Sequence, residues 1–303
     1  MKALVTGGAG FIGSWVVDYL VNEGFEVVVI DNLSTGKKEN LNKKAGFYQL
    51  DIRDKKIADI FKNEKPDCVF HLAAQMDVRK SIINPVEDAN VNILGSLNIL
   101  NNCVANKVKK IIFSSSGGAI YGDNVEVPSS ETEKEKPISP YGVAKLAVEK
   151  YLGFYKKVYG LDYASLRYAN VYGPRQNSKG EAGVIAIFSD KILSGEKVKI
   201  NGSGKQTRDF VYMKDVAKAN VMALNLSGVF NVGTGKETEI NQIFQKIKEI
   251  AGKGEKFHGS AIAGEQLRSC LDSSKLNKKG WKPDYSLELG LKETLEFFKN
   301  KNK

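Results

Sequence analysis

The feature that most constrains the fold is a glycine-rich turn near the start of the chain, Gly7–Gly13. It follows an apolar run, Lys2–Thr6, that predicts a buried strand, and it precedes Ser14–Glu23, which has the pattern of a helix. The early glycines of such a turn let the backbone approach a pyrophosphate, and the last lets helix and strand pack closely. The helix N-terminus then offers N–H groups to phosphates. The segment therefore predicts a dinucleotide-binding turn.

The second expected strand, Glu26–Ile30, ends at an acidic residue, Asp31. A carboxylate at this place accepts hydrogen bonds from the ribose hydroxyls of an adenosine and repels a 2′-phosphate. Asp31 therefore favours NAD over NADP. The competing interpretation is that Asp31 only caps the loop that follows the strand.

Strand and helix patterns continue to alternate through the first half of the chain. The further expected strands are Phe47–Leu50, Cys68–Leu72, Lys110–Phe113 and Tyr163–Arg167, and the intervening helices are Lys55–Asn63, Asn84–Asn102 and Val143–Tyr159. Repeated strand–helix units predict an α/β fold, a doubly wound parallel (Rossmann) sheet covered on both faces.

The pattern changes after Tyr168, where a polar, looped region begins. The elements expected beyond it are the helices Val184–Ser194, Asp215–Asn225, Asn241–Ala251 and Leu287–Lys299 and the strands Lys197–Ile200 and Gly228–Gly233. We expect a smaller C-terminal α/β substrate domain interleaved with the first. The predicted domains are 1–167 plus 207–233 for NAD and 168–206 plus 234–303 for the substrate.

Several residues at strand ends are candidates for cofactor contact. Asp51 and Ile52 follow the third strand and are placed to meet the adenine, although Asp51 could instead cap the next helix. The small residues of Ala73–Gln75 suit a backbone that passes close to a cofactor. Asn90 either contacts the cofactor or simply belongs to its helix. His71, inside a buried strand, is expected to be a core residue.

The chemistry is predicted by a second segment, Ser139–Lys145, in which Tyr141 and Lys145 stand four residues apart. This spacing places both on one face of a helix. A lysine ammonium beside a phenol favours the phenolate and lowers the pKa of the tyrosine. Such a phenol can take a proton from an alcohol and return it. The alternative is a solvated helix face.

Serine hydroxyls end the fifth strand at Ser114–Ser116. The carboxyl ends of parallel strands are where doubly wound sheets bind ligands. A serine there can hydrogen-bond the hydroxyl that Tyr141 deprotonates. An ordinary serine turn at the end of a strand is the alternative.

Composition argues against several other classes of protein. The formal charge of +10 comes from scattered lysines without interleaved aromatic residues, which disfavours nucleic-acid binding. The three cysteines stand far apart and the chain has only two histidines, so we expect neither a disulfide framework nor a metal site. Neither a membrane-spanning apolar run nor a signal-peptide pattern is found, and we expect a cytoplasmic protein.

These motifs together resemble the extended short-chain dehydrogenase/reductases. Within that family the chain is most similar to nucleotide-sugar epimerases of the UDP-glucose 4-epimerase type. The resemblance covers essentially the whole chain and rests on the segments Gly7–Gly13, Asp31–Asn32, His71–Gln75, Ser114–Gly122, Ser139–Lys145, Arg167–Arg175, Gln206–Tyr212 and Trp281–Pro283.

The resemblance implies a bound NAD that is not consumed and a UDP-sugar substrate epimerised at C4 through a transient 4-keto sugar. It implies that Tyr141 acts as the base, that Lys145 lowers its pKa and holds the nicotinamide ribose, and that Ser116 orients the hydroxyl. The implied cofactor-binding residues are Gly7, Gly10, Phe11, Ile12, Gly13, Asp31, Asn32, Asp51, Ile52, Leu72, Ala73, Ala74, Gln75, Asn90, Ser114, Tyr141, Lys145 and Tyr168. The implied substrate-binding residues are Ser116, Tyr141, Asn170, Gly202, Arg208, Arg268 and Ser269.

The chain departs from the family pattern at two places. Four residues separate Ser116 from Tyr121 where several relatives have three, so Ser115 is the alternative catalytic serine. Ile262–Glu265 replaces a common Arg-Pro-Gly-acid motif whose arginine binds the diphosphate. Either Arg208 and Arg268 compensate, or the substrate differs.

The alternatives are narrowed by residues that are absent. Related dehydratases need an acidic pair where this chain has Gly117 and Gly118, and elimination needs a proton donor and a base. Decarboxylating relatives usually have a glutamate nearby, and this chain has none there. A net reductase would favour NADPH, which Asp31 disfavours. The remaining alternatives are an epimerase of UDP-glucuronate or another nucleotide sugar, and a non-catalytic NAD-binding regulator.

Two further expectations concern the substrate and the assembly. Ser269 falls near the position that faces the C2 substituent, and its small side chain predicts space for an N-acetyl group. The resemblance also implies a homodimer formed through the helices around Asn92–Asn102 and Ala144–Tyr159.

Overall fold

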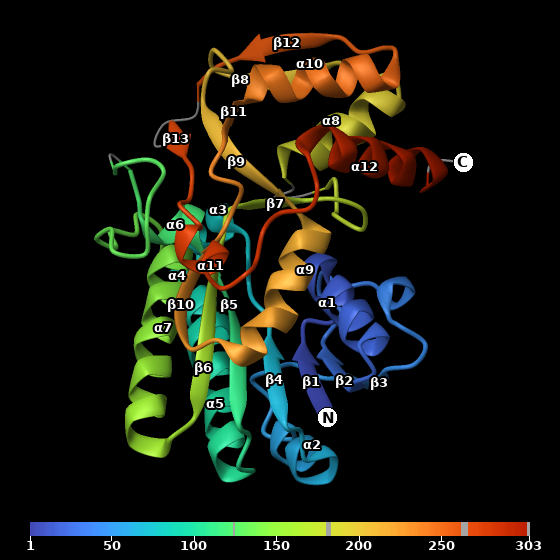
Figure 1. Cartoon of the computed structure of the whole chain (residues 1–303). Helices are drawn as coiled ribbons and strands as arrows, with labels where there is room; N and C mark the ends of the chain where they lie inside the picture. Colours follow the sequence, from blue (N-terminus) through green and yellow to red (C-terminus); the bar gives the residue numbers. More distant parts are fainter. Residues whose placement is uncertain (124, 180–182, 262–265, 302–303) are drawn as a thin grey trace. The chain divides into compact units, whose positions relative to one another are not determined.

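The computed structural model describes residues 1–123, 125–179, 183–261 and 266–301 (Figure 1). The chain forms two compact units, each assembled from separate stretches of sequence. The first comprises Met1–Ile120, Glu135–Arg167 and Ala217–Phe230. The second comprises Tyr121–Lys134, Tyr168–Val216 and Asn231–Lys303.

The first unit is built on a seven-stranded sheet in the order β10-β6-β5-β4-β1-β2-β3 (Figure 1). β1 pairs in parallel with both β2 and β4, so the strand order reverses there. This reversal is the switch point at which doubly wound sheets bind ligands, and the predicted Rossmann fold is confirmed. The strands are β1 (Lys2–Thr6), β2 (Glu26–Asp31), β3 (Gly46–Gln49), β4 (Cys68–His71), β5 (Lys110–Ser116), β6 (Asp162–Tyr168) and β10 (Gly228–Val232).

Helices cover this sheet, and the strands β1, β2 and β4 at its centre are therefore mostly buried. Val27–Ile30 of β2, for example, are all buried. Val69 of β4 and Ile111 of β5 share one core cluster with Ile99 and Val148 from two of the helices. The helices are α1 (Phe11–Asn22), α2 (Ile57–Glu64), α3 (Val78–Ile83), α4 (Pro85–Ala89), α5 (Gly95–Ala105), α6 (Gly117–Ile120) and α7 (Pro140–Tyr159), with a short 3₁₀ turn η1 at Lys38–Asn40.

The helix expected over Asn84–Asn102 is divided into α4, a π-helical segment η2 (Asn90–Leu94) and α5. Asn84 caps α4 by accepting a hydrogen bond from the backbone N–H of Glu87. Within η2 the carbonyl of Asn92 accepts a hydrogen bond from the Ser96 hydroxyl at 2.6 Å. The widened turn is a departure that the apolar spacing did not predict, and such turns often occur at functional sites.

Helix α7 begins at Pro140, three residues before the predicted start. The Ser139 side chain caps it by accepting a hydrogen bond from the N–H of Gly142 at 3.2 Å. Proline is favoured at the first helical position because its missing N–H would have no partner there. Gly160, with φ of +73°, ends the helix. Tyr141 and Lys145 consequently lie in the first two turns of one regular helix.

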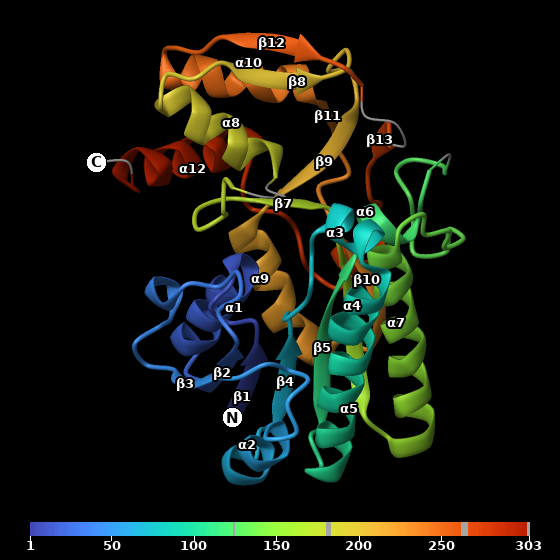
Figure 2. The same ribbon diagram turned by 180° about the vertical axis from the view of Figure 1, so that it is seen from behind.

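The second unit contains two small sheets and a group of helices. β9 (Thr207–Tyr212) is the centre of a four-stranded sheet with β7 (Asn170–Tyr172), β11 (Glu237–Glu239) and β13 (Arg268–Ser269), while β8 (Val198–Asn201) pairs with β12 (Lys256–Gly259). Figure 2 shows α8 (Val184–Leu193), α10 (Ile240–Ala251) and α12 (Leu287–Lys301) lying together beside the smaller sheet. The helix α11 (Ser274–Asn277) also belongs to this unit. The helix α9 (Met213–Met222) begins in it and continues into the first unit from Ala217, and the 3₁₀ turn η3 (Ala223–Asn225) belongs to the first unit.

The compact units differ from the predicted domain boundaries at three segments, 121–134, 207–216 and 231–233, of which the first two are the longest. Residues 207–216 belong to the second unit because β9 pairs with β7, β11 and β13. Residues 121–134 also belong to it, because the Ser129 N–H donates to the Cys270 carbonyl and its own carbonyl accepts from Asp272. Both groupings depend on pairing between segments far apart in the sequence.

The Trp281–Pro283 segment has a structural role in the second unit. Trp281 is fully buried, and its indole N–H donates to the carbonyl of Asp215 at 3.1 Å. The Asp215 carboxylate in turn accepts the backbone N–H groups of Asp284 and Tyr285. These bonds attach the start of the C-terminal segment to α9.

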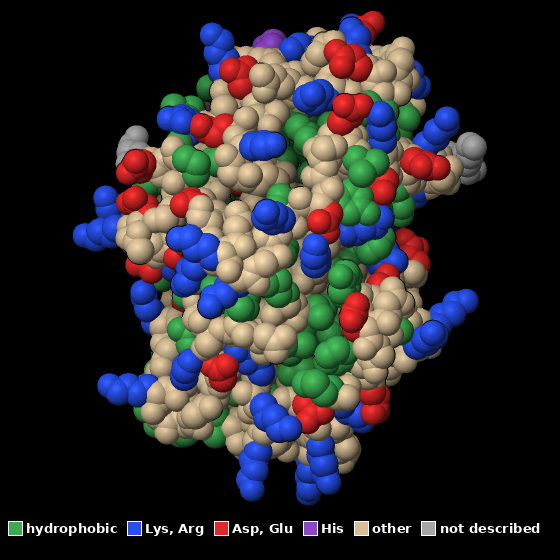
Figure 3. Space-filling model, viewed as in Figure 1, with side chains coloured by type: hydrophobic (Ala, Val, Ile, Leu, Met, Phe, Trp, Pro, Cys, Tyr) green, Lys and Arg blue, Asp and Glu red, His purple; other side chains and the backbone are tan. Residues whose placement is uncertain are grey.

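The surface carries dispersed charge. On the face shown in Figure 3, lysine and arginine side chains lie among acidic ones without forming a continuous patch. Within the described part of the chain, none of the helices has the length and apolar character needed to span a bilayer.

Candidate active site

The glycine turn between β1 and α1 is packed closely against neighbouring backbone atoms. Gly7 has φ of +73°, and a Cβ there would lie 2.7 Å from the backbone nitrogen of Ala73. A Cβ on Gly13 would collide with the carbonyl oxygen of Gly7. Both positions therefore require glycine.

The N-terminus of α1 is arranged to receive an anion. Its N-cap is Gly10, and none of the described side chains caps the helix or places an acid in its first turn. The first N–H groups of α1 consequently have no side-chain cap within the described chain. This arrangement fits the pyrophosphate of NAD, which such N–H groups and the helix dipole would stabilise.

Asp31 is nearly buried, with 7 % exposure, and holds the glycine turn. Its two oxygens accept the N–H groups of Ala9 at 3.0 Å and Leu33 at 2.8 Å. The loop-capping interpretation is thus confirmed, and it does not exclude a ligand because each carboxylate oxygen has a second lone pair. Contact with a ribose stays a prediction.

Asp51, after β3, is held mainly by Arg53. The guanidinium donates to it from two nitrogens at 2.9 Å each, and this contact lowers the pKa of Asp51 to about 2. Asn32 also donates to it, at 2.8 Å. Ile52 has a buried side chain, and its carbonyl accepts from the amide of Asn98. The predicted adenine contact at these residues is untested.

The segment after β4 is locked by a buried polar network. The Ala73 N–H donates to the Thr6 hydroxyl at 3.2 Å, and His71 contacts the same hydroxyl at 2.7 Å. Burial lowers the pKa of His71 to about 3, so it is neutral, as expected of a core histidine. The Gln75 N–H donates to Asn92. Leu72, Ala74 and Asn90 adjoin this network and are half-buried.

Tyr141 and Lys145 share one face of α7, as the four-residue spacing predicts. The Lys145 Nζ lies 5.7 Å from the centre of the Tyr141 ring and donates to the Ser114 carbonyl at 2.7 Å. It also lies 4.8 Å from the Phe113 ring. Burial lowers the pKa of Lys145 to about 8, against the opposing effect of the carboxylates of Asp88 and Glu149. A desolvated ammonium is therefore held next to the phenol.

The structure separates the two candidate serines. The Ser115 hydroxyl is buried and donates to Glu149 Oε1 at 2.6 Å. Ser116, the next residue of β5, is half-buried and points to the opposite side because strand side chains alternate. The extra residue before Tyr121 is absorbed in the single turn of α6, Gly117–Ile120. This geometry favours Ser116 over Ser115.

Sequence reasoning missed the buried ion pair beneath these residues. Arg167 of β6 and Glu149 of α7 have side chains that are 2 % and 3 % exposed, and they meet at 2.6 Å. Glu149 also accepts from Ser115 and from Ser165 at 2.9 Å. The available signal was a charge inside each apolar pattern: Glu149 lies one turn beyond Lys145, and Arg167 ends an apolar strand.

Four of the predicted substrate residues lie on the small sheet of the second unit. In the β13–β9 pairing Ser269 stands opposite Arg208, next to Arg268. Asn170 pairs with Phe210 of β9 through β7 and is exposed. Sequence patterns predicted neither β9 nor this grouping.

The remaining predicted residues are placed as follows. Gly202 follows β8 with φ of +61°, and its N–H donates to the Gly259 carbonyl at 3.0 Å. Tyr168 ends β6 with a buried side chain. Arg268 is exposed and paired with Glu237 at 2.5 Å. The motif departure at 262–265 lies outside the described residues.

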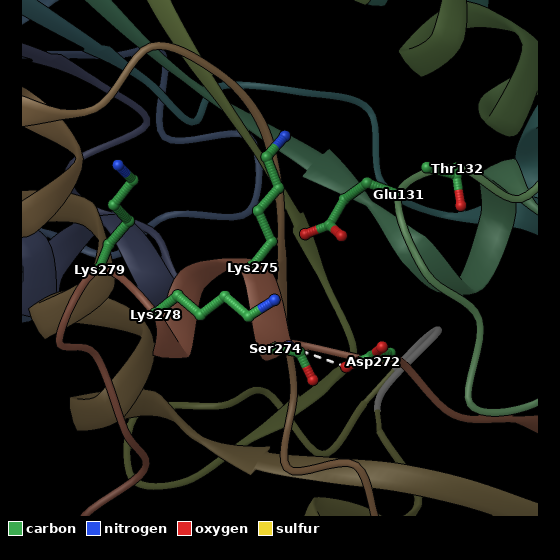
Figure 4. A pocket seen from close by; sticks show the side chains of 7 residues that line it. All are labelled: Glu131, Thr132, Asp272, Ser274, Lys275, Lys278 and Lys279. Atoms are coloured by element: carbon green, nitrogen blue, oxygen red, sulfur yellow. Dashed lines mark hydrogen bonds between the residues drawn. The ribbon is translucent and has the colours of Figure 1, made fainter.

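The second unit also contains a hollow of about 550 Å³, shown in Figure 4. None of the predicted substrate residues lines it. Its lining is polar and of mixed charge, and consists of Glu131, Thr132, Asp272, Ser274, Lys275, Lys278 and Lys279. It is therefore separate from the β9 sheet positions described above.

The model of the NAD dependent epimerase/dehydratase family matches residues 3–233 of this chain. Among solved structures, a UDP-glucose 4-epimerase of Thermotoga maritima with UDP-glucose is 51 % identical, with a TM-score of 0.98 and 100 % of each chain covered. A UDP-glucose 4-epimerase of Thermus thermophilus in complex with NAD is 43 % identical, with a TM-score of 0.95, covering 98 % of this chain and 99 % of the other.

A third similar structure is an epimerase named for a different sugar. A UDP-N-acetylglucosamine 4-epimerase of Methanobrevibacter ruminantium M1, in complex with UDP-N-acetylmuramic acid, is 41 % identical with a TM-score of 0.94. The match covers 99 % of this chain and 98 % of the other.

Proposed function

Because the chain belongs to the NAD dependent epimerase/dehydratase family, we propose that it is an isomerase that inverts C4 of a UDP-hexose with bound NAD. The substrates are UDP-glucose and UDP-galactose, with N-acetylated forms as an extension. The observation that carries the proposal is the placement of Tyr141 and Lys145 on one face of α7, with Lys145 bonded to the end of β5.

The first unit is the NAD-binding part. The glycine turn and the N-terminus of α1 hold the pyrophosphate, and Asp31 accepts from the adenosine ribose while it retains its loop contacts. Asn32, Asp51 and Ile52 lie on the adenine side. On the nicotinamide side lie Leu72, Ala73, Ala74, Gln75, Asn90, Ser114, Tyr141, Lys145 and Tyr168. Held by these residues, NAD would supply reversible hydride transfer at C4 of the sugar.

The residues of α7 and β5 carry the proton chemistry. The Tyr141 phenolate oxygen takes the proton of the 4-hydroxyl and later returns it. The Lys145 ammonium stabilises the phenolate, and the Ser116 hydroxyl orients the reacting oxygen. The 4-keto sugar turns over between the two steps, so its other face receives the hydride.

The second unit supplies contacts to the nucleotide sugar. Asn170, Gly202 and Arg208 bind the uracil and the diphosphate. Arg268 replaces the arginine missing at Ile262 by exchanging Glu237 for a phosphate oxygen. The exposed position of its guanidinium supports this exchange, because an ion pair at the surface costs little to open.

The experiment that tests this function incubates the purified chain without added NAD, separately with UDP-galactose and UDP-N-acetylgalactosamine, and resolves the products by proton NMR. We expect conversion of one or both to the C4 epimer. Tyr141→Phe should lower turnover by about 1,000-fold, within the range for a general acid–base. Tyr19→Phe on α1 is the matched control, with a half-buried tyrosine outside the site.

Two outcomes would replace the proposal. Failure to convert either sugar, with turnover of UDP-glucuronate or another nucleotide sugar, would identify a different epimerase substrate. Retention of NAD without turnover of any nucleotide sugar would identify a non-catalytic NAD-binding regulator.

The acceptance of N-acetylhexosamines is proposed to depend on Ser269, which is small and nearly buried on β13. Support comes from the similarity to a UDP-N-acetylglucosamine 4-epimerase. Ser269→Tyr should reduce turnover of UDP-N-acetylgalactosamine by about 100-fold, because a pocket without space for the extra group loses roughly 3 kcal/mol of transition-state binding. Turnover of UDP-galactose should change little. Equal effects on both sugars would contradict this role.

We also propose that two copies of the chain form a homodimer. Apolar side chains lie on the outer face of α7 at Val143, Phe154 and Val158, and on the preceding helices at Ile82 and Leu94, with exposures between 49 % and 62 %. Covering such a face removes apolar surface from water. Phe154→Glu should shift the sedimentation coefficient from dimer to monomer, and Leu289→Glu on α12 is the control. A monomeric unaltered chain would contradict the proposal.

The same proposal includes a cytoplasmic location and a role in galactose metabolism. All three cysteines are buried and unbonded, which suits a reducing compartment. Fractionation of the native cells, with detection of the chain in the soluble cytoplasmic fraction, is the direct measurement.

A further inference from the structure

Asp88 of α4 is a buried carboxylate with an unusual environment. Its residue is 2 % exposed, and Oδ1 accepts from the amides of Gln75 and Asn92 at 2.9 Å each. Oδ2 is buried and has no hydrogen-bond partner among the described residues. A buried charge without compensation is costly, so this oxygen calls for an explanation.

The other buried carboxylate near the site, Glu149, already has its counter-charge. Arg167 contacts it at 2.6 Å, and Ser115 and Ser165 donate to it as well. By contrast, within the described chain no lysine or arginine lies at ion-pair distance from Asp88. The positive charge that offsets Asp88 must therefore act from slightly farther away.

Lys145 meets this requirement. It is 3 % exposed and belongs to α7, which packs against both α4 and η2. Its ammonium has three donors, of which one is used by the Ser114 carbonyl at 2.7 Å. Burial lowers the pKa of Lys145, and the carboxylate of Asp88 acts in the opposite direction and raises it. Each group thus has unused hydrogen-bonding capacity and needs the opposite charge.

We propose that Asp88 is the counter-charge of Lys145, a positioning residue that keeps the ammonium charged and directed toward the Tyr141 ring. The π-helical turn η2 supports this role, because its Asn92 donates to Asp88 Oδ1 and so fixes the carboxylate, whose Oδ2 stays without a hydrogen-bond partner among the described residues. The consequence for turnover rests on the proposed function, whereas the pairing of the two charges does not.

Lys145 is faced by few other titratable groups. On its own helix these are Tyr141 and Glu149, and Arg167 of β6 offsets the charge of Glu149. His71 of β4 is neutral.

The helix α3, which also packs on α7, carries Arg79 and Lys80, and both are exposed. Of the two carboxylates that raise the pKa of Lys145, Glu149 is paired with Arg167, whereas Asp88 has no ion-pair partner among the described residues.

A double-mutant cycle in thermal unfolding tests the pairing without any turnover. Lys145→Met leaves Asp88 uncompensated and should lower the melting temperature by about 5 °C. Adding Asp88→Asn should restore part of that loss, because the stranded charge is gone. Additive effects of the two substitutions would overturn the proposal.

The cycle stays decisive if a variant fails to fold. Should Asp88→Asn alone not fold, folding of the double variant would support the pairing, because the unpaired ammonium is then removed too. Failure of the double variant together with both single variants would overturn it. Far-ultraviolet circular dichroism identifies the folded variants.

The pH profile of epimerisation separates positioning from a merely structural role. The pKa of Lys145 is about 8, and removal of the Asp88 charge lowers it further. In Asp88→Asn the loss of activity at high pH should therefore begin about one unit lower. Glu87→Gln removes an equal but exposed charge one residue away, paired with Arg53 at 2.8 Å, and should leave the profile unchanged.

The two ways of failing are distinguishable. An unmoved profile in Asp88→Asn, with normal turnover at neutral pH, would overturn the inference and leave the proposed function standing. Absence of turnover in the unaltered chain would remove the proposed function, and the thermal cycle would still decide the pairing.

Discussion

Two arginine–glutamate pairs, one in each unit, have similar geometry and opposite environments. Arg167 meets Glu149 at 2.6 Å, with side chains that are 2 % and 3 % exposed. Arg268 meets Glu237 at 2.5 Å, with exposures of 61 % and 26 %. Both guanidinium groups use two nitrogens. The arginine–glutamate contacts themselves are alike, and the pairs differ in burial and in a second ion pair of Arg167 with Glu135 at 2.9 Å.

The comparison distinguishes a buried ion pair that fixes neighbouring elements from an exposed ion pair that a ligand can open. In the first unit, Glu149 also accepts from Ser115 and Ser165, so the pair joins α7 to β5 and β6 beneath Tyr141 and Lys145. In the second unit, Arg268 is open to water, and a ligand phosphate can compete for it. In the proposed mechanism, the buried pair would hold the residues of proton transfer in place, and the exposed pair would open for the substrate.

The largest expected effect is on stability at the buried pair. Arg167→Met strands the Glu149 carboxylate in the core and should lower the free energy of unfolding by about 4 kcal/mol. Urea unfolding followed by circular dichroism measures the change. Arg268→Met is the matched control, expected to cost less than about 1 kcal/mol because exposed pairs contribute little. Equal losses in the two variants would show that burial does not distinguish the pairs.

The two histidines of the chain extend the comparison to pH. Buried His71 has a pKa lowered to about 3, so the unfolded chain binds a proton at higher pH than the folded chain does. Its contribution to stability is fully present above about pH 6.5 and decreases as the pH falls toward 3. By pH 5 the loss should be about 2 kcal/mol.

Unfolding of His71→Gln between pH 6.5 and 5 should show a correspondingly smaller loss than the unaltered chain. His258→Gln, which replaces an exposed histidine of the second unit, should retain the whole loss. An unchanged pH slope in His71→Gln would mean that other groups cause the acid sensitivity.

The smallest expected effect is on substrate binding at the exposed pair. Arg268→Met should raise KM for UDP-galactose about tenfold with little change in kcat, the pattern of a lost contact that is equal in ground and transition states. Steady-state kinetics measure both constants. Glu237→Gln should lower KM slightly, since the guanidinium no longer has a competing carboxylate. An unchanged KM in both variants would assign the diphosphate to other residues.

A structural feature could be predicted from the sequence when the residues that form it lie close together along the chain. Local patterns were sufficient for the turn at Gly7–Gly13, for the acid at Asp31 and for the shared face of Tyr141 and Lys145. Each of these rests on spacing within a few residues. The alternation of strands and helices was enough for the parallel sheet, because parallel neighbours need a crossover between them.

Groups whose partners are remote in sequence were missed or left open. The choice between Ser115 and Ser116 required Glu149, which is 34 residues away from Ser115. The strand β9 was not predicted from its sequence, and it is defined by its pairing with β7, β11 and β13. The interruption of the long helix at η2 reflects the contacts of Asn92 with Gln75 and Asp88 rather than local propensity.

The sequence by itself thus determined the fold class, the glycine turn at Gly7–Gly13 and the shared face of Tyr141 and Lys145, because helix and strand periods and glycine sterics are local properties. The tertiary structure decided which serine is accessible, which charges are buried with ion-pair partners, and that Asp88 Oδ2 has no hydrogen-bond partner among the described residues. Burial removes water from a charge, and only the folded chain shows which groups have lost it. That physical difference is why identical residue types hold the core together in one unit and remain exchangeable in the other.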